Sequence, residues 1–361
     1  MELRVGIVGT ESSHVDHIID YLNVARARAG VRVTALVPGP GGGAGGGAGT
    51  GAEAGERVRE LCRAGGIDLV AGDVPALLDV ADALIVTARH GGSHRDLALP
   101  FLEAGRPVLV DKPFACRVAD AEEMLRVADA RGALVTSYSA LRYLPATEEL
   151  AAEFGAIGPA RSVVATGPAD EESEYGGIFF YGIHPVDVAL RLAPGPVGEV
   201  RVDRVAESIV ASATAGGARV TVNLVKPGPA GPGDPGGPVP FHALAVGRHG
   251  IAARELPTDG NYLAPGLEAF LGMIDGTVPP LPPDDLLRPI AFLEAIDQSL
   301  KTRNPHSPER IVPTPPLSPD SALLSDLSVP LPSVTHPHAG YIRHRKPLPH
   351  PCPASKPPGS C

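Results

Sequence analysis

Residues 1–138 alternate between short apolar runs and longer stretches whose apolar positions recur at helical spacing. Residues 3–8 and 31–37 are apolar runs bounded by polar residues and glycine, as in strands that are covered on both faces. Such runs separated by helices predict right-handed crossovers and a parallel, doubly wound sheet. The expected strands are residues 3–8, 31–37, 67–70, 83–87, 107–110 and 133–137, and the expected helices follow Ser13 and span 53–64, 93–104 and 118–131.

The pattern changes after Arg142. Residues 145–154 predict a helix, and the apolar runs that follow alternate with polar positions and have no helix signal between them. This alternation is typical of a mainly antiparallel sheet with one buried face. We therefore expect an α/β fold in which a parallel sheet over residues 1–138 precedes an α+β domain over residues 139–302. The expected strands are 161–166, 199–213, 219–225 and 241–246, and the closing helices are 264–275 and 284–300.

Glycine and proline are clustered rather than spread along the chain. Many of the 43 glycines and 40 prolines lie in residues 38–51, 227–240 and 303–361. Segments of this composition bury too little apolar surface to order themselves, so we expect a flexible insert, a hairpin loop and a disordered tail. The tail has P-x-x-P spacing at 313–316 and 316–319, which could dock on a proline-binding module, although such spacing arises easily in any proline-rich segment.

Several classes of protein are disfavoured. With 31 basic and 41 acidic residues, the chain has a net charge of −10 and lacks the positive excess that nucleic-acid binding requires. We see neither a secretory signal pattern nor an apolar run of membrane-spanning length, so we expect a cytoplasmic protein that binds no membrane. The four cysteines have no C-x-x-C spacing, which favours reduced thiols. The pairs His14/His17 and His90/His94 lack a third ligand at metal-binding spacing, so we expect no metal site.

The turn after the first strand is the place where dinucleotide-binding folds carry G-x-G-x-x-G. Here the sequence is GTESSH, so Gly9 is the first glycine, and Glu11 and His14 take the positions of the other two. A carboxylate at Glu11 would face the pyrophosphate unless it turns away. A helix that begins behind the two serines still offers N–H groups and a positive dipole end to a phosphate. The expected cofactor contacts here are Gly9, Thr10, Ser12 and Ser13.

The acidic residue that would hold the adenosine ribose at the end of the second strand is missing. Val37 is followed by Pro38 and the glycine-rich insert, and no nearby arginine is clearly placed to bind a 2′-phosphate. At this point the sequence leaves both NAD and NADP open as the cofactor.

A lysine at the carboxyl end of a predicted strand gives a stronger signal. Lys112 follows the run 107–110 and precedes Pro113, and the carboxyl ends of parallel strands border the ligand crevice of an open α/β sheet. In this setting the segment resembles the E-K-P signature of the Gfo/Idh/MocA family (glucose–fructose oxidoreductase and inositol dehydrogenase), with Asp111 for the usual Glu. The other landmarks, in family order, are A-G-x-P-V at 104–108, Arg142, G-I-H-P-V-D at 182–187 and the closing helix 290–300.

The resemblance covers residues 2–302 and implies a Rossmann domain followed by a substrate and oligomerisation domain. It implies an enzyme that uses NAD or NADP to interconvert a secondary hydroxyl and a ketone on a sugar, cyclitol or related polyol. Lys112 would hydrogen-bond the reacting oxygen beside the nicotinamide, and His184 would act as general acid/base. Asp187 is expected to orient or pack, and a homodimer or homotetramer is implied through the sheet face of the second domain. Further cofactor contacts are expected from Thr87, His94, Asp111 and Pro113.

One position departs from the family pattern. The family often has an Asp four residues before the histidine, where this chain has Phe180. Tyr181 or Glu174 could supply the supporting group instead. Arg142 could contact substrate or cofactor, or could form a salt bridge between the two domains.

Other interpretations of the same residues stay open. Lys112 could be an exposed lysine and His184 a structural histidine. Glu11, Pro38 and Phe180 together also fit a family member that has lost catalysis and binds a nucleotide or metabolite in a regulatory role.

Overall fold

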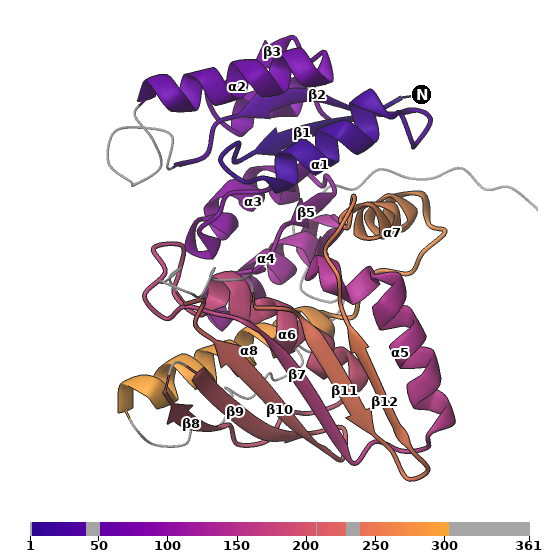
Figure 1. The fold of residues 1–361 in the computed structure, drawn as a ribbon. Coiled ribbons are helices and arrows are strands. Elements are labelled where there is room, and N and C mark those ends of the chain that lie inside the picture. Colours follow the sequence, from indigo (N-terminus) through magenta and orange to yellow (C-terminus); the bar gives the residue numbers. More distant parts are fainter. Residues whose placement is uncertain (1, 41–50, 207, 229–238, 303–361) are drawn as a thin grey trace, which may run out of the picture. The chain divides into compact units, whose positions relative to one another are not determined.

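The computed structural model describes residues 2–40, 51–206, 208–228 and 239–302 (Figure 1). The proline-rich tail, most of the glycine-rich insert and the centre of the predicted hairpin loop lie outside the described residues, so the predictions for these segments stay predictions. Within the described part of the chain, no helix is both long enough and apolar enough to cross a membrane.

The first sheet is parallel throughout, as the alternation of strands and helices predicts. Its strands are β1 (Leu3–Val8), β2 (Val31–Val37), β3 (Leu69–Val70), β4 (Ala83–Val86), β5 (Val108–Val110) and β6 (Val135–Ser137). The connecting helices are α1 (His14–Ile19), α2 (Gly51–Gly65), α3 (His94–Glu103) and α4 (Val118–Arg131). The strand order is β3-β2-β1-β4-β5-β6. Because this order reverses between β1 and β4, the loops that follow these two strands border a switch point, where open α/β sheets bind ligands.

Helices cover both faces of this sheet, which is why its central strands are apolar without alternation. Along β4, Leu84 and Val86 pack into the cluster that contains α3 and α4, whereas Ile85 packs into the cluster that contains α1. Every residue of β4 is buried, and so is every residue of β5. The continuous apolar run in the sequence therefore indicates a strand that is covered on both faces.

The second sheet is mainly antiparallel, as predicted. Its strands are β7 (Ser162–Pro168), β8 (Arg201–Val205), β9 (Ser208–Ala215), β10 (Ala218–Val225), β11 (His242–Val246) and β12 (Ile251–Glu255), in the order β12-β11-β7-β10-β9-β8. The β7–β10 pair is parallel, and the other paired neighbours are antiparallel. The accompanying helices are α5 (Pro145–Ala156), α6 (Phe179–Leu192), α7 (Ala264–Asp275) and α8 (Pro283–Thr302). Helix α6 packs against β7 and β10, and α8 packs against α6 (Figure 1).

The structure of the second half differs from the prediction in three places. The sequence showed no helix between the expected strands, yet α6 lies between β7 and β8. The expected strand at 199–213 is a hairpin of β8 and β9, in which Ala206 has a positive φ of 49°. Strand β12 was not predicted. Its short run, Ile251 to Glu255, has too little alternation of apolar and polar residues to indicate a strand, and pairing with β11 orders it.

Candidate active site

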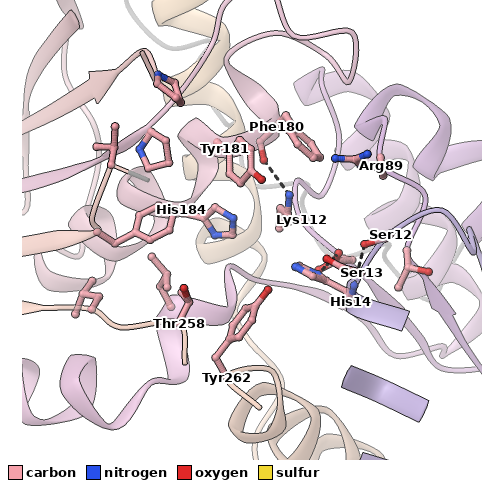
Figure 2. A pocket seen from close by; sticks show the side chains of 18 of the residues that line it. Ser12, Ser13, His14, Arg89, Lys112, Phe180, Tyr181, His184, Thr258 and Tyr262 are labelled. Atoms are coloured by element: carbon pink, nitrogen blue, oxygen red, sulfur yellow. Dashed lines mark hydrogen bonds and ion pairs between the residues drawn. The ribbon is translucent and has the colours of Figure 1, made fainter. Parts of the chain in front are cut away.

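A cavity of about 800 Å³ lies between the carboxyl edge of the first sheet and the elements of the second half of the chain (Figure 2). The switch-point topology brings the loops after β1, β4 and β5 to one side of it. The start of α6, the segment after β12 and Tyr262, two residues before α7, form the other side. The cavity lining includes Glu11, Ser12, Ser13, His14, Thr87, Arg89, Asp111, Lys112, Phe180, Tyr181, His184, Phe241, Thr258 and Tyr262.

Lys112 is a buried cation at the floor of this cavity. It stands two residues after β5, is 6% exposed, and its Nζ donates a hydrogen bond to the Phe180 carbonyl at 3.0 Å. The same Nζ lies 3.9 Å from the centre of the Phe180 ring. Burial lowers the pKa of Lys112 to about 8, Asp111 opposes this shift, and the Arg89 charge adds to it. An ammonium with this pKa is charged at pH 7 and can give up its proton near neutrality.

Asp111 forms a close pair with His14 beside the lysine. The Asp111 Oδ2 and His14 Nδ1 atoms are 2.6 Å apart. Burial alone would raise the pKa of Asp111, but the His14 ring and the Lys112 ammonium outweigh it and hold the pKa at about 2. Thus His14, which takes the place of the third glycine in the loop, ties that loop to the end of β5. The edge of the Tyr262 ring closes over His14, with ring centres 5.9 Å apart.

His184 enters the cavity from α6 and is held from behind. It is 6% exposed, and its Nδ1 lies 2.7 Å from the Ser139 hydroxyl, so Nε2 is the ring nitrogen left for a ligand. Burial lowers the pKa of His184 well below its ordinary value, and the charges of Lys112 and His14 lower it further. A neutral imidazole at pH 7 is therefore expected, and such a ring can accept or donate a proton.

Asp187 and Arg142 form the support behind His184. The Asp187 carboxylate accepts a hydrogen bond from the Ser139 N–H at 3.0 Å and pairs with Arg142 at 2.7 Å. Arg142 also pairs with Asp285 at 2.8 Å. Neither Asp187 nor Arg142 lines the cavity. Arg142 therefore forms salt bridges, but both partners lie in the second half of the chain with it, so the predicted salt bridge between the two domains is not seen. The orienting interpretation of Asp187 agrees with its contact to Ser139.

An aromatic group takes the place of the missing carboxylate at position 180. The guanidinium of Arg89 lies 3.9 Å from the centre of the Tyr175 ring and 5.1 Å from that of Phe180. It also donates a hydrogen bond to the Tyr175 hydroxyl at 3.0 Å. Phe180 therefore stands between two cations, Arg89 and Lys112, and supplies π-electron density where the family pattern supplies a negative charge.

The loop after β1 is drawn tightly against the loop after β4. Gly9 has a φ of 99°, and a Cβ there would overlap the Ala88 nitrogen, so this position requires glycine. The Thr87 hydroxyl donates to the Gly9 carbonyl at 2.7 Å. His94 is fully buried, with its Nδ1 and Nε2 at 2.7 and 2.6 Å from the carbonyls of Pro113 and Ala88. These contacts join the ends of β1, β4 and β5.

The structure thus brings together some of the predicted site residues and separates others. The predicted residues that line the cavity are Ser12, Ser13, Thr87, Asp111, Lys112, Tyr181 and His184. The cavity lining does not include Gly9, Thr10, His94 or Pro113. Of these, Gly9, His94 and Pro113 hold the loops that do line it. Glu174 is exposed and does not line the cavity, so the structure gives it no place beside His184. Tyr181 does line it and is 41% exposed.

Some lining residues were not foreseen from the sequence. Arg89 lies three residues after β4, and its position at the switch point was a usable signal. Nothing in the sequence near Tyr262 or Phe241 indicates a place in the site. Their contacts with His14 and His184 depend on packing between distant parts of the chain.

Comparison with known proteins finds similarity over the first part of the chain. Residues 3–139 match the family model GFO_IDH_MocA, described as an oxidoreductase family with an NAD-binding Rossmann fold. An uncharacterized oxidoreductase of Escherichia coli (strain K12), YhhX, is 31% identical over 137 residues, which are 34% of this chain and 39% of that protein. An inositol 2-dehydrogenase of Gluconacetobacter diazotrophicus is 33% identical over 132 residues, covering 37% of this chain and 35% of that protein. The matched segment thus spans less than two fifths of either relative.

A solved structure extends the likeness in fold to most of the chain. The myo-inositol dehydrogenase of Lactobacillus casei, in complex with NAD(H) and myo-inositol, has a TM-score of 0.68 and 17% sequence identity, and the match covers 88% of this chain and 99% of that one. The predicted fold class and the predicted cofactor class, NAD or NADP, are confirmed by these matches. Residues 3–139 are thus similar to the NAD-binding Rossmann domain of the Gfo/Idh/MocA family of oxidoreductases.

Proposed function

We propose that the chain is an NAD(P)-dependent oxidoreductase that interconverts a secondary hydroxyl and a ketone on a sugar, cyclitol or related polyol. The observation that carries this proposal is the meeting of Lys112 and His184 in one cavity. Lys112 lies in the loop after β5 of the first sheet and His184 lies on α6 beside the second sheet. Their surroundings give Lys112 a pKa of about 8 and keep the His184 ring neutral at pH 7. Pairs of titratable groups tuned in this way in a cleft are typical of catalytic sites.

The residues at the switch point fit a nicotinamide dinucleotide. Gly9 permits the tight turn, and the loops after β1 and β4 border the crevice with the hydroxyls of Ser12, Ser13 and Thr87. We propose that these residues hold the dinucleotide and that its nicotinamide end lies over Lys112. When bound, the cofactor accepts or supplies the hydride.

The protein's own groups would manage the proton and the charge on the substrate oxygen. In the oxidation direction, the Lys112 ammonium donates a hydrogen bond to the substrate hydroxyl and stabilises negative charge as the O–H bond breaks. His184 accepts that proton at Nε2, because Nδ1 is occupied by Ser139. In the reduction direction, the same nitrogen returns the proton to the oxygen. Ser139 and Asp187 keep the ring in place and do not touch the substrate.

A titration with reduced cofactor tests this function. Because the chain has no tryptophan, the fluorescence of NADH or NADPH can be followed without that background. We expect saturable binding of at least one dinucleotide at micromolar to millimolar concentration. Turnover with a panel of cyclitols and sugars should fall by about 10²–10⁴-fold in Lys112→Ala. If the wild-type chain binds neither cofactor at millimolar concentration, the proposal is wrong.

A regulatory member of the family is the second candidate. Glu11 in the cofactor loop and Phe180 in place of the usual carboxylate favour it, because they change the cofactor side and the proton-transfer side together. A chain that binds a dinucleotide with wild-type fold, but turns over no polyol and loses nothing measurable in Lys112→Ala, would favour this candidate.

The proposal includes self-association through the second sheet. The face of this sheet opposite α6 carries half-exposed residues such as Val164, Val210 and Leu244 at alternate positions. A homodimer or homotetramer that covers this face would give a solution mass of two or four chains by light scattering. A mass of one chain at micromolar concentration would contradict it.

A further inference from the structure

The carboxylate of Glu11 lies over the end of β2. Its Oε1 accepts a hydrogen bond at 3.0 Å from the backbone N–H of Arg89, which lies in the loop after β4. On its other side it touches Gly39, two residues beyond β2, where an added Cβ would overlap Oε2 and lie 2.8 Å from Oε1. The side chain therefore leaves the loop after β1 and is directed toward the neighbouring strand β2.

This is the place where β2 brings no acid of its own. After Val37 the chain continues as Pro38, Gly39 and Pro40. In dinucleotide-binding folds, a carboxylate at the end of the second strand accepts hydrogen bonds from the hydroxyls of the adenosine ribose. The strand of this chain thus lacks the group, while Glu11 places the same group beside the same strand end.

We propose that Glu11 is the ribose-binding carboxylate of this chain and makes it select NAD over NADP. This inference rests on the proposed function, because it concerns the cofactor of the same site. The Arg89 N–H occupies one lone pair of Oε1, which leaves Oε2 and the remaining lone pairs of the carboxylate for two ribose hydroxyls. Glu11 thus stands at the second glycine position of the loop and also supplies the carboxylate that the end of β2 lacks.

The charges around the loop oppose a 2′-phosphate. A phosphate at the ribose 2′ position would bring up to two negative charges against the Glu11 carboxylate. Compensation would need a cation that is not already paired. Arg57 lies beside Thr10 but is bound by both carboxylate oxygens of Asp16, and the Arg89 guanidinium is stacked on Tyr175. Both arginines that the structure describes beside this loop therefore already have other partners, so neither is free to compensate a 2′-phosphate.

Gly39 provides a way to move the carboxylate without removing it. The three atoms nearest to a methyl group on Gly39 all belong to the carboxylate end of the flexible Glu11 side chain, so Gly39→Ala is expected to fold and to displace the carboxylate. Glu11→Gln removes the charge and keeps the size. Glu103→Gln, at the exposed end of α3, changes the net charge by the same amount and is the matched control.

The test measures the dissociation constants of NADH and NADPH for the full chain and these three variants by cofactor fluorescence, with thermal melting to confirm folding. We expect the wild-type chain and Glu103→Gln to bind NADH at least tenfold more tightly than NADPH. In Glu11→Gln, NADH binding should weaken about tenfold and the preference should collapse toward equality. Gly39→Ala should change the preference in the same direction.

The outcomes separate the two proposals. If the wild-type chain binds both cofactors and Glu11→Gln leaves their ratio unchanged, this inference is overturned and the proposed function stands. Tighter NADH binding by Glu11→Gln also overturns it, because Glu11 would then repel the dinucleotide. If the wild-type chain binds neither cofactor, the proposed function and this inference both fail.

Discussion

Replacing Asp187 by Asn tests the buried network that holds His184. The Asp187 side chain is 4% exposed, with one oxygen on the Arg142 guanidinium and the other on the Ser139 N–H. An asparagine can offer an acceptor to only one of these two donors and turns its own NH₂ group toward the other. The substitution therefore removes the charge and leaves one buried donor without its partner.

The structure sets the size of the effect. Removing one partner of a buried ion pair costs about 3–5 kcal/mol, because the remaining charge is left in a poorly solvated place. Arg142 keeps its second partner, Asp285, whose side chain is 22% exposed. We therefore expect Asp187→Asn to lower the free energy of unfolding by about 3 kcal/mol, the lower end of that range. Asp285→Asn, which removes the more exposed partner, should cost about 1 kcal/mol.

Urea denaturation followed by circular dichroism measures both variants against the wild-type chain. Turnover should fall in Asp187→Asn more than NADH binding weakens, because the substitution frees the Ser139 segment that holds the His184 ring. A loss below about 1 kcal/mol in Asp187→Asn, or a loss no larger than that of Asp285→Asn, would refute the reasoning about this network.

Three more predictions follow from single contacts. Turnover should decline as the pH rises through about 8, because the Lys112 ammonium loses its proton there. The lowered pKa also means that burying the charged lysine opposes folding below pH 8, and that this penalty disappears by about pH 10.5. Lys112→Met should therefore be more stable than the wild-type chain at pH 7, and the difference should vanish toward pH 10.5. Gly9→Ala should lower the free energy of unfolding by on the order of 3 kcal/mol in chemical denaturation, because its Cβ meets the backbone of the β4 loop at a positive φ. Ser139→Ala should cost about 1 kcal/mol of stability through the lost cap on the Leu141 N–H and should lower kcat with an unchanged Kd for NADH.

The sequence predicted the first sheet well because its strands are short and covered on both faces. Leu84, Ile85 and Val86 point to opposite faces in turn, and all of them meet apolar helices, so the run is apolar throughout and has a clear beginning and end. Helices such as α4 have one covered face and one exposed face, and their period is visible in the sequence.

Helix α6 was missed for the opposite reason. Nearly all of its residues are buried, between the second sheet and α8, so no polar face interrupts the apolar positions. Gly182 and Pro185 inside it also argue against a helix in a local reading of the sequence. Tertiary packing stabilises this helix, and a single sequence does not show it.

The candidate site also has a part that the sequence predicted and a part that it did not. The position of Lys112 followed from the strand that precedes it, because a strand end in a parallel sheet has a known place at the crevice. The direction of the Glu11 side chain could not be predicted, since it depends on a hydrogen bond to Arg89, 78 residues away, and on the space left by Gly39. The cation–π contacts of Phe180 likewise depend on how α6 approaches the end of β5.

The most direct test of the account is a crystal structure of the chain grown with NAD. We expect the pyrophosphate over the loop after β1 and the ribose hydroxyls on the Glu11 carboxylate. The nicotinamide ring should lie in the cavity beside Lys112, with room for a substrate hydroxyl between Lys112 Nζ and His184 Nε2. A dinucleotide bound with its nicotinamide end away from Lys112, or crystals that take up no NAD at millimolar concentration, would contradict it.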